Sequence, residues 1–257
     1  MTTKFRMAYI TVGAALLLAG VGAGMNARAG AAAPRARQAG ATASGQGNIA
    51  GRVNFSGKPP QLRPILMTND PVCASQQEGT ALPEDGRVNA NGTLPNAFVY
   101  ISKGSGNLSV PAPSSTVAMT QKGCSYEPHV LGIQVGQRLQ VTSEDPTTHN
   151  IHVSPKTGHD WNVSQQPGSE PVTTKFSHAE IMVPVHCNVH PWMSAYIGVV
   201  TNPYFAVTGA DGSFTIKGVP PGDYTLSIWT ATFGTQEHQV TVRAGETATA
   251  DFTFEAK

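Results

Sequence analysis

The sequence predicts an all-β fold, and three observations support this prediction. The 257 residues include 27 Gly and 19 Pro but only 13% charged residues, a composition typical of short strands joined by turns. Short apolar segments recur at even spacing, with turn residues between them. No segment shows the apolar stripe of an amphipathic helix. The length allows one large domain or two ordinary ones, and we expect two β-domains.

The N-terminal residues predict export. Two basic residues precede an apolar run over residues 7–21, and a small-residue cleavage motif ends at Ala29. Residues 1–29 are therefore interpreted as a signal peptide and residues 30–47 as a disordered linker. A membrane anchor is the alternative, but the apolar run is short and rich in Gly and Ala. We expect a periplasmic or secreted protein with no membrane span after cleavage.

The expected strands follow in order. Alternation over residues 49–55 predicts the first strand, residues 61–95 are mostly loop, and residues 97–101 form the next strand. A regular series comes next, at residues 117–121, 129–135, 137–142, 150–153, 172–176, 181–186 and 195–200. The polar residues 154–171 between them are left unassigned.

The last part of the chain changes character. Residues 205–207 and 213–216 flank an Ala-Asp-Gly turn and predict a hairpin. Residues 219–228 predict a Pro-Gly turn followed by another alternating strand, and two more strands are expected at residues 237–242 and 248–254. The formal net charge of +1 does not indicate the basic surface that nucleic-acid-binding proteins usually have, so we do not expect a nucleic-acid partner.

Three cysteines in an exported protein leave one unpaired thiol. Cys73 and Cys124 lie in polar, turn-rich sequence and are the natural disulfide pair. The alternative, a second metal site that adds His129 to these cysteines, lacks the close ligand spacing of such sites. Cys187 is then the free thiol.

Cys187, His190 and Met193 are three residues apart in one short loop, which indicates a metal site. Soft sulfur ligands beside imidazole suit copper, and two His, one Cys and a weak axial Met form the blue-copper electron-transfer geometry. The missing ligand is expected to be His149, from a separate strand end. Asn150 is expected to bind the ligand loop and the sulfur by hydrogen bonds. Structural zinc or no metal are the alternatives.

His190 is expected to be the ligand nearest to solvent, with Pro191 and Trp192 beside it as an electron-transfer patch. Strand alternation turns His152 and His186 away from the ligands. The remaining candidates are interpreted as structural, solvated or core residues: His129, His159, His178, His238, Met182 and Trp229.

The segments 148–152 and 186–193 resemble the two ligand segments of amicyanin- and plastocyanin-like cupredoxins, over roughly residues 108 to 200. This resemblance implies a Greek-key sandwich with one type 1 copper ion held by His149, Cys187, His190 and Met193. Two residues depart from the amicyanin pattern: Val189 replaces the usual Pro, and Trp192 replaces a smaller aromatic residue.

The segments 210–214 and 218–226 resemble the carboxypeptidase-regulatory-like, transthyretin-like sandwich, whose opening strands look like residues 49–55 and 95–101. The resemblance implies that the cupredoxin (105–202) is inserted in or joined to a second domain made of residues 48–104 and 203–257. Bacterial exported proteins with this pairing are sometimes labelled methylamine-utilisation proteins.

These observations favour an exported one-electron carrier between redox protein partners, such as a cytochrome and a dehydrogenase, and not an enzyme. The alternative is an envelope-, carbohydrate- or partner-binding scaffold, or a copper-trafficking protein, that does not use copper for electron transfer. A multicopper oxidase would need further clusters of histidines, and the unassigned histidines are scattered.

Overall fold

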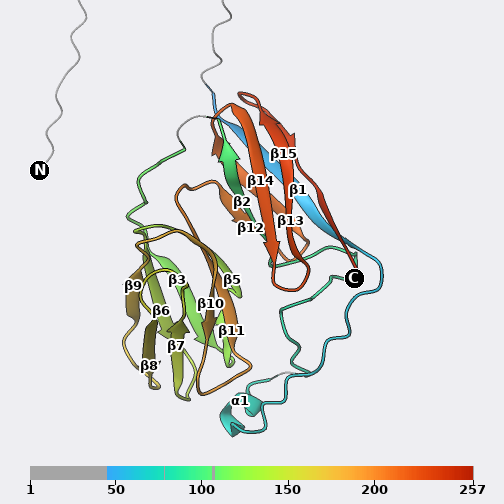
Figure 1. Ribbon diagram of the computed structural model, residues 1–257. Helices are drawn as coiled ribbons and strands as arrows, with labels where there is room; N and C mark the ends of the chain where they lie inside the picture. The colour runs from blue at the N-terminus through green and yellow to red at the C-terminus, as the bar shows by residue number, and fades with distance from the viewer. Residues whose placement is uncertain (1–44, 78, 106–107, 257) are drawn as a thin grey trace, which may run out of the picture. The chain divides into compact units, whose positions relative to one another are not determined.

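The computed structural model describes residues 45–77, 79–105 and 108–256, and it confirms the all-β prediction (Figure 1). The expected signal peptide, 1–29, and residues 30–44 of the expected linker lie outside the described residues. The last residue assigned to that linker, Gly47, already begins the first strand. Among the described residues, no helix is long and apolar enough to cross a membrane.

Strands from both ends of the described chain form one two-sheet sandwich, here called the outer sandwich (Figure 1). Its sheets have the orders β13-β1-β16, with β17 also paired to β1, and β12-β2-β14-β15. The strands are β1 (Gly47–Ser56), β2 (Phe98–Gly104), β12 (Phe205–Val207), β13 (Ser213–Val219), β14 (Gly222–Thr230), β15 (Gly234–Val242), β16 (Thr247–Thr249) and β17 (Phe252–Glu255).

The strands between β2 and β12 form a second sandwich, the inserted sandwich. Its sheets have the orders β5-β11-β10-β7-β8 and β4-β3-β6-β9. The strands are β3 (Val117–Lys122), β4 (Ser125–Glu127), β5 (Val130–Gln134), β6 (Arg138–Ser143), β7 (His149–Val153), β8 (Trp161–Gln165), β9 (Val172–Lys175), β10 (Glu180–His186) and β11 (Ser194–Val200). One β-sandwich is therefore inserted into the other.

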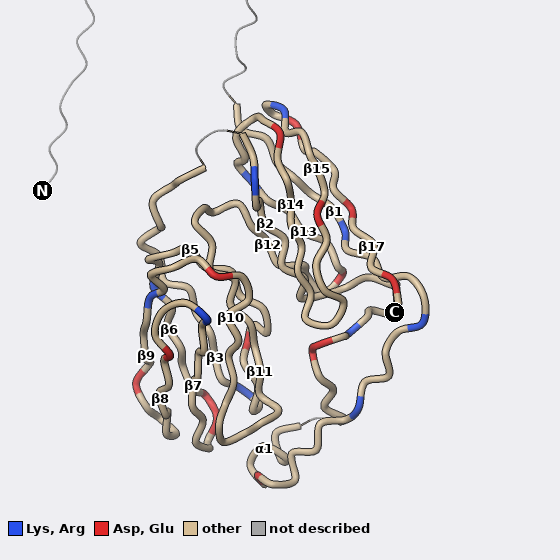
Figure 2. Tube along the Cα trace, in the orientation of Figure 1, with Lys and Arg blue, Asp and Glu red and all other residues tan. Residues whose placement is uncertain are grey.

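Each sandwich has its own apolar core, built by the alternation that the sequence shows. In the inserted sandwich, Leu139 and Val141 of β6 are fully buried and face Ile151 and Ile197 of the opposite sheet. The outer sandwich buries a comparable set from β1, β2, β13 and β14. Truncating one such fully buried Leu or Ile to Ala costs about 2–5 kcal/mol of stability. Figure 2 shows charged residues of both signs interspersed along both sandwiches.

A smaller apolar cluster joins the two sandwiches. It consists of buried Phe98 of β2 with Val130, Met182 and Val200 of the inserted sandwich. Gly198 of β11 permits this contact, because a Cβ added there would lie 2.5 Å from the Phe98 ring. Met182 belongs to this core, as expected, and has a positive φ of 63° at an irregularity in the β10–β11 pairing.

The segment that links β1 to β2 holds the one helix of the described residues, α1 (Pro71–Ser75), which the sequence analysis missed. Asp70 is its N-cap and accepts hydrogen bonds from the Val72 and Cys73 amides. Pro71 at the first helical position has the fixed φ that a helix start requires. A disulfide from Cys73 to Cys124 ties this helix to the inserted sandwich, which confirms the predicted pairing.

Three predictions about strands are corrected. Residues 205–207 and 213–216 do not form a hairpin, because β12 pairs with β2 and β13 pairs with β1. The turn between them carries the chain from one sheet of the outer sandwich to the other. The expected strand 248–254 is two strands, β16 and β17, separated where Ala250 donates to the Ala50 carbonyl. β4 and β8 lie in segments for which no strand was predicted.

Candidate metal centre

The loop between β10 and β11 presents three of the predicted ligands. Pairing of His186 with Ser194 closes the loop at its base. Inside it, the Cys187 amide donates to the Met193 carbonyl at 3.3 Å, and the Met193 amide donates to the His190 carbonyl at 2.9 Å. These bonds fold the loop tightly, so that residues three apart in sequence surround one point. The fourth predicted ligand, His149, is the first residue of β7 and enters from the neighbouring strand.

The donor atoms of three predicted ligands converge. His149 Nδ1 lies 2.9 Å from His190 Nδ1, and Cys187 Sγ lies 3.9 Å from His190 Nδ1. Two ligand atoms bound to one ion at 2.0–2.3 Å can be at most about 4.6 Å apart, so both separations are compatible with a shared ion. The donor set, one thiolate and two imidazoles, suits copper or zinc.

All four predicted ligands are buried, with exposed fractions of 0% for His149, 2% for Cys187 and His190 and 1% for Met193. Met193 belongs to the same apolar cluster as Cys187. Cys187 is the free cysteine, as the parity argument predicted. Water is therefore excluded from the point at which the donors meet, and a bound ion would be shielded from solvent.

Asn150 connects the two ligand segments. Its amide nitrogen lies 3.5 Å from Cys187 Sγ, and its side-chain oxygen accepts from the Asn188 amide at 2.7 Å. The same oxygen lies 3.3 Å from Cys187 Sγ, while the side-chain nitrogen donates to Asn162 of β8. These bonds fix the sulfur relative to β7, as expected for Asn150.

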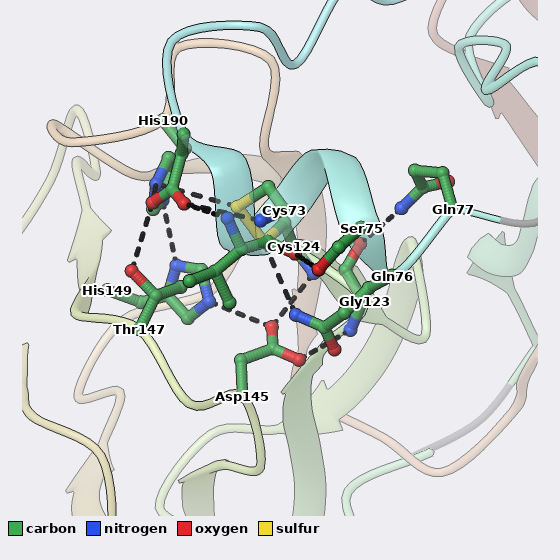
Figure 3. The surroundings of a disulfide bond; sticks show 12 residues. Cys73, Ser75, Gln76, Gln77, Gly123, Cys124, Asp145, Thr147, His149 and His190 are labelled. Atoms are coloured by element: carbon green, nitrogen blue, oxygen red, sulfur yellow. Dashed lines mark hydrogen bonds and ion pairs between the residues drawn. A yellow bond between two sulfur atoms is a disulfide. The ribbon is translucent and has the colours of Figure 1, made fainter.

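Two carboxylates that the sequence analysis missed lie at the Nε2 atoms of the two histidines, and Figure 3 shows one of them, Asp145, beside His149. His149 Nε2 lies 2.8 Å from Asp145 Oδ2, and His190 Nε2 lies 2.9 Å from Asp70 Oδ2. The hydrogen bond from His190 is the main reason that the pKa of Asp70 falls to about 2. Burial lowers the pKa of His149, which favours the neutral imidazole that a metal requires. Asp70 precedes Pro71, and this N-cap signature was the available signal.

His190 is 2% exposed, the same fraction as Cys187 and more than His149 or Met193, so the predicted electron-transfer patch offers almost no imidazole surface to solvent. Its ring is covered by Asp70 and by the disulfide, whose Cys73 sulfur lies 3.6 Å from His190 Nε2. Pro191 is exposed. Trp192 is half-buried, lies 5.0 Å from the His190 ring between centroids and donates to the Cys124 carbonyl. A cavity of about 350 Å³ lies against Trp192 and Met193.

Two other histidines contact the ligand loop from outside: His152 Nδ1 lies 3.0 Å from Asn188 Oδ1, and His129 Nδ1 lies 3.0 Å from the Ser194 carbonyl oxygen. His152 and His186 face each other across β7 and β10 with ring centroids 4.3 Å apart, and His152 contacts Asp160. His129 binds Asp85 at 2.8 Å. Within the described ranges, every group of three or more metal-binding side chains close enough to share an ion contains His149 or His190.

One family model, the carboxypeptidase regulatory-like domain, matches residues 194–255. This match agrees with the resemblance found for the C-terminal part of the chain. It begins in β11, which pairs within the inserted sandwich, and continues through β12 to β17 of the outer sandwich. No curated protein matches the chain in sequence.

Several solved structures are similar to part of the chain. One is a copper-containing nitrite reductase from Thermus scotoductus SA-01, with 21% identity, a TM-score of 0.31 and coverage of 38% of this chain and 25% of that chain. Another is a purple cupredoxin from Nitrosopumilus maritimus, with 21% identity, a TM-score of 0.28 and coverage of 32% and 97%. A reduced mutant of amicyanin has 17% identity, a TM-score of 0.30 and coverage of 39% and 97%.

This chain thus spans about a quarter of the nitrite reductase chain. Because these TM-scores are low, the interpretation of the site rests on the geometry of its own ligands.

Proposed function

We propose that the protein is an exported type 1 copper protein that transfers single electrons between redox protein partners. The observation that carries this proposal is the convergence of Cys187 Sγ, His149 Nδ1 and His190 Nδ1 in a buried site beside Met193. Copper in such a site supplies a one-electron couple between its cuprous and cupric states. The predicted N-terminal signal supports export to a periplasmic or extracellular compartment.

The residues around the site serve this chemistry by holding one geometry. Asn150 fixes the sulfur, and the tight loop fixes His190 and Met193. A rigid site that excludes water and suits both oxidation states of copper lowers the reorganisation energy of electron transfer. Trp192, which contacts His190 and lines the adjacent cavity, together with exposed Pro191 forms the surface at which a redox partner would dock.

The test is a spectroscopic titration of the purified protein with Cu(II). We expect one copper per chain, with an intense visible thiolate-to-copper absorption and a type 1 paramagnetic resonance spectrum. Cys187→Ser should abolish this absorption, and His238→Ala, which changes an exposed histidine of β15 in the outer sandwich, should keep it. Wild-type protein without the absorption, or an absorption that persists in Cys187→Ser, would contradict the proposal.

A second candidate function, copper trafficking or storage, is favoured by one observation. His190 is only 2% exposed, so it offers no imidazole edge to a partner. The two functions differ in the rate at which the copper-loaded protein exchanges electrons with a reduced cytochrome. Fast exchange that is slowed by Trp192→Ala would support the electron carrier, whereas slow exchange in the wild-type protein would favour trafficking.

A further inference from the structure

Each predicted histidine ligand has a carboxylate at its Nε2 atom, and this arrangement determines which ring nitrogen is free to bind a metal. His149 and Asp145 are buried, with side-chain exposures of 0% and 1%. In the second pair, His190 is 2% and Asp70 18% exposed. A carboxylate can only accept a hydrogen bond, so each Nε2 must carry the proton. Each Nδ1 then directs its lone pair to the point where Cys187 lies.

Each carboxylate is itself fixed. Asp145 accepts from the Gly123 and Cys124 amides at 2.7 and 2.8 Å. Both of these residues have a positive φ, 58° and 54°, and such a turn aims successive amides at an anion. Because the amides already bind the carboxylate strongly, Asp145 has little freedom to turn away from His149.

Asp70 is fixed in a matching way on the other side. It accepts from the Val72 and Cys73 amides through Oδ1, and from the Thr147 hydroxyl at 2.9 Å through Oδ2. The disulfide Cys73–Cys124, drawn in Figure 3, joins α1, whose N-terminal amides bind Asp70, to the turn whose amides bind Asp145. The two segments that position the histidine ligands are thus linked covalently by the disulfide.

We propose that Asp70 and Asp145 are positioning residues that set both imidazoles for the metal and favour its oxidised, more highly charged state. This inference rests on the proposed copper site. A carboxylate bonded to the far nitrogen of a ligand histidine fixes the tautomer and raises the basicity of the ligand. Two negative charges beside the site, of which Asp145 is buried and Asp70 partly exposed, also stabilise a divalent ion more than a monovalent one. The pair should therefore lower the reduction potential of the bound copper.

The alternative is that these carboxylate–histidine pairs only stabilise the fold. Two other carboxylate–histidine pairs in the chain serve as controls that distinguish the two explanations. Asp85 binds His129 and Asp160 binds His152 at similar distances, but neither histidine lies among the converging donors. Asp→Asn keeps the shape and an accepting oxygen while it removes the charge. A purely structural role predicts that none of the four substitutions changes the reduction potential selectively, whereas the proposal predicts a change of potential only for Asp70 and Asp145.

The experiment measures Cu(II) and Cu(I) affinities and the reduction potential of Asp70→Asn and Asp145→Asn. We expect 10- to 100-fold weaker Cu(II) binding, by analogy with other carboxylate–histidine–metal supports, and a smaller loss for Cu(I). Each tenfold difference between the two losses raises the potential by about 59 mV. Asp85→Asn and Asp160→Asn should leave the potential unchanged.

A second measurement needs no metal. Nitrogen-15 imidazole shifts of the metal-free protein should show Nε2 protonated on His149 and His190, with mixed tautomers after Asp→Asn, because an amide can also donate. Equal potentials in site and control variants, or unchanged tautomers, would overturn the proposal. If the wild-type protein binds no copper, the proposed function fails, and the tautomers alone decide whether the carboxylates position the rings.

Discussion

Removal of the disulfide tests how strongly α1 is tied to the inserted sandwich. Cys73 and Cys124 are 51 residues apart in sequence, which corresponds to about 4 kcal/mol in the chain-entropy account of a cross-link. This closed loop includes β2, which is held in the outer sandwich. If the outer sandwich persists when the inserted one unfolds, the effective loop is shorter and the loss approaches about 3 kcal/mol.

The assay is urea unfolding of the metal-free protein, since a bound ion would add its own stabilisation. Cys73→Ala/Cys124→Ala is compared with the oxidised parent, both carrying Cys187→Ser so that the free thiol cannot attack the disulfide. We expect the unfolding free energy to fall by about 3–4 kcal/mol. Ser75→Ala, an exposed change in the same helix, should stay within about 0.5 kcal/mol. An unchanged midpoint and slope in the double variant would refute the reasoning.

Three further predictions concern packing, pH and metal. Gly198→Ala forces a methyl group against the Phe98 ring and should cost about 1–3 kcal/mol in denaturant unfolding, whereas Gly209→Ala meets no atom closer than 3.5 Å and should cost less. Burial raises the pKa of Tyr196 to about 12, so its neutral phenol stabilises the fold fully below pH 10, and this contribution is lost as the pH rises towards 12. The free energy of unfolding should therefore fall between pH 10 and 12 relative to that of Tyr196→Phe. A difference between the two proteins that does not change with pH would contradict this prediction. Copper at a hundredfold excess over its Kd should raise the unfolding free energy by about 2.7 kcal/mol in calorimetry, an effect that Cys187→Ser should remove.

Sequence reasoning located the strands that alternate clearly and the ligand loop, because these depend on local periodicity and on ligand chemistry. It missed α1, whose five residues are too few to show a helical period. The burial of His190 was not foreseen for the same reason: residues 61–95 read as loop, and nothing local shows that Asp70 covers a ring 120 residues away. The hairpin prediction failed because a turn signal fixes a reversal of the chain but not the sheet in which each strand pairs.

The insertion also constrains how the chain acquires its structure. β1 pairs in parallel with β16 and β17, about two hundred residues later, as in the contact of Arg52 with Asp251 at a separation of 199. Contacts this distant close slowly in a flexible chain. β2 and β12, however, leave the inserted sandwich as antiparallel neighbours, with Tyr100 opposite Phe205. Folding of the inserted sandwich would bring these two strands together, and we expect it to precede closure of the outer sandwich.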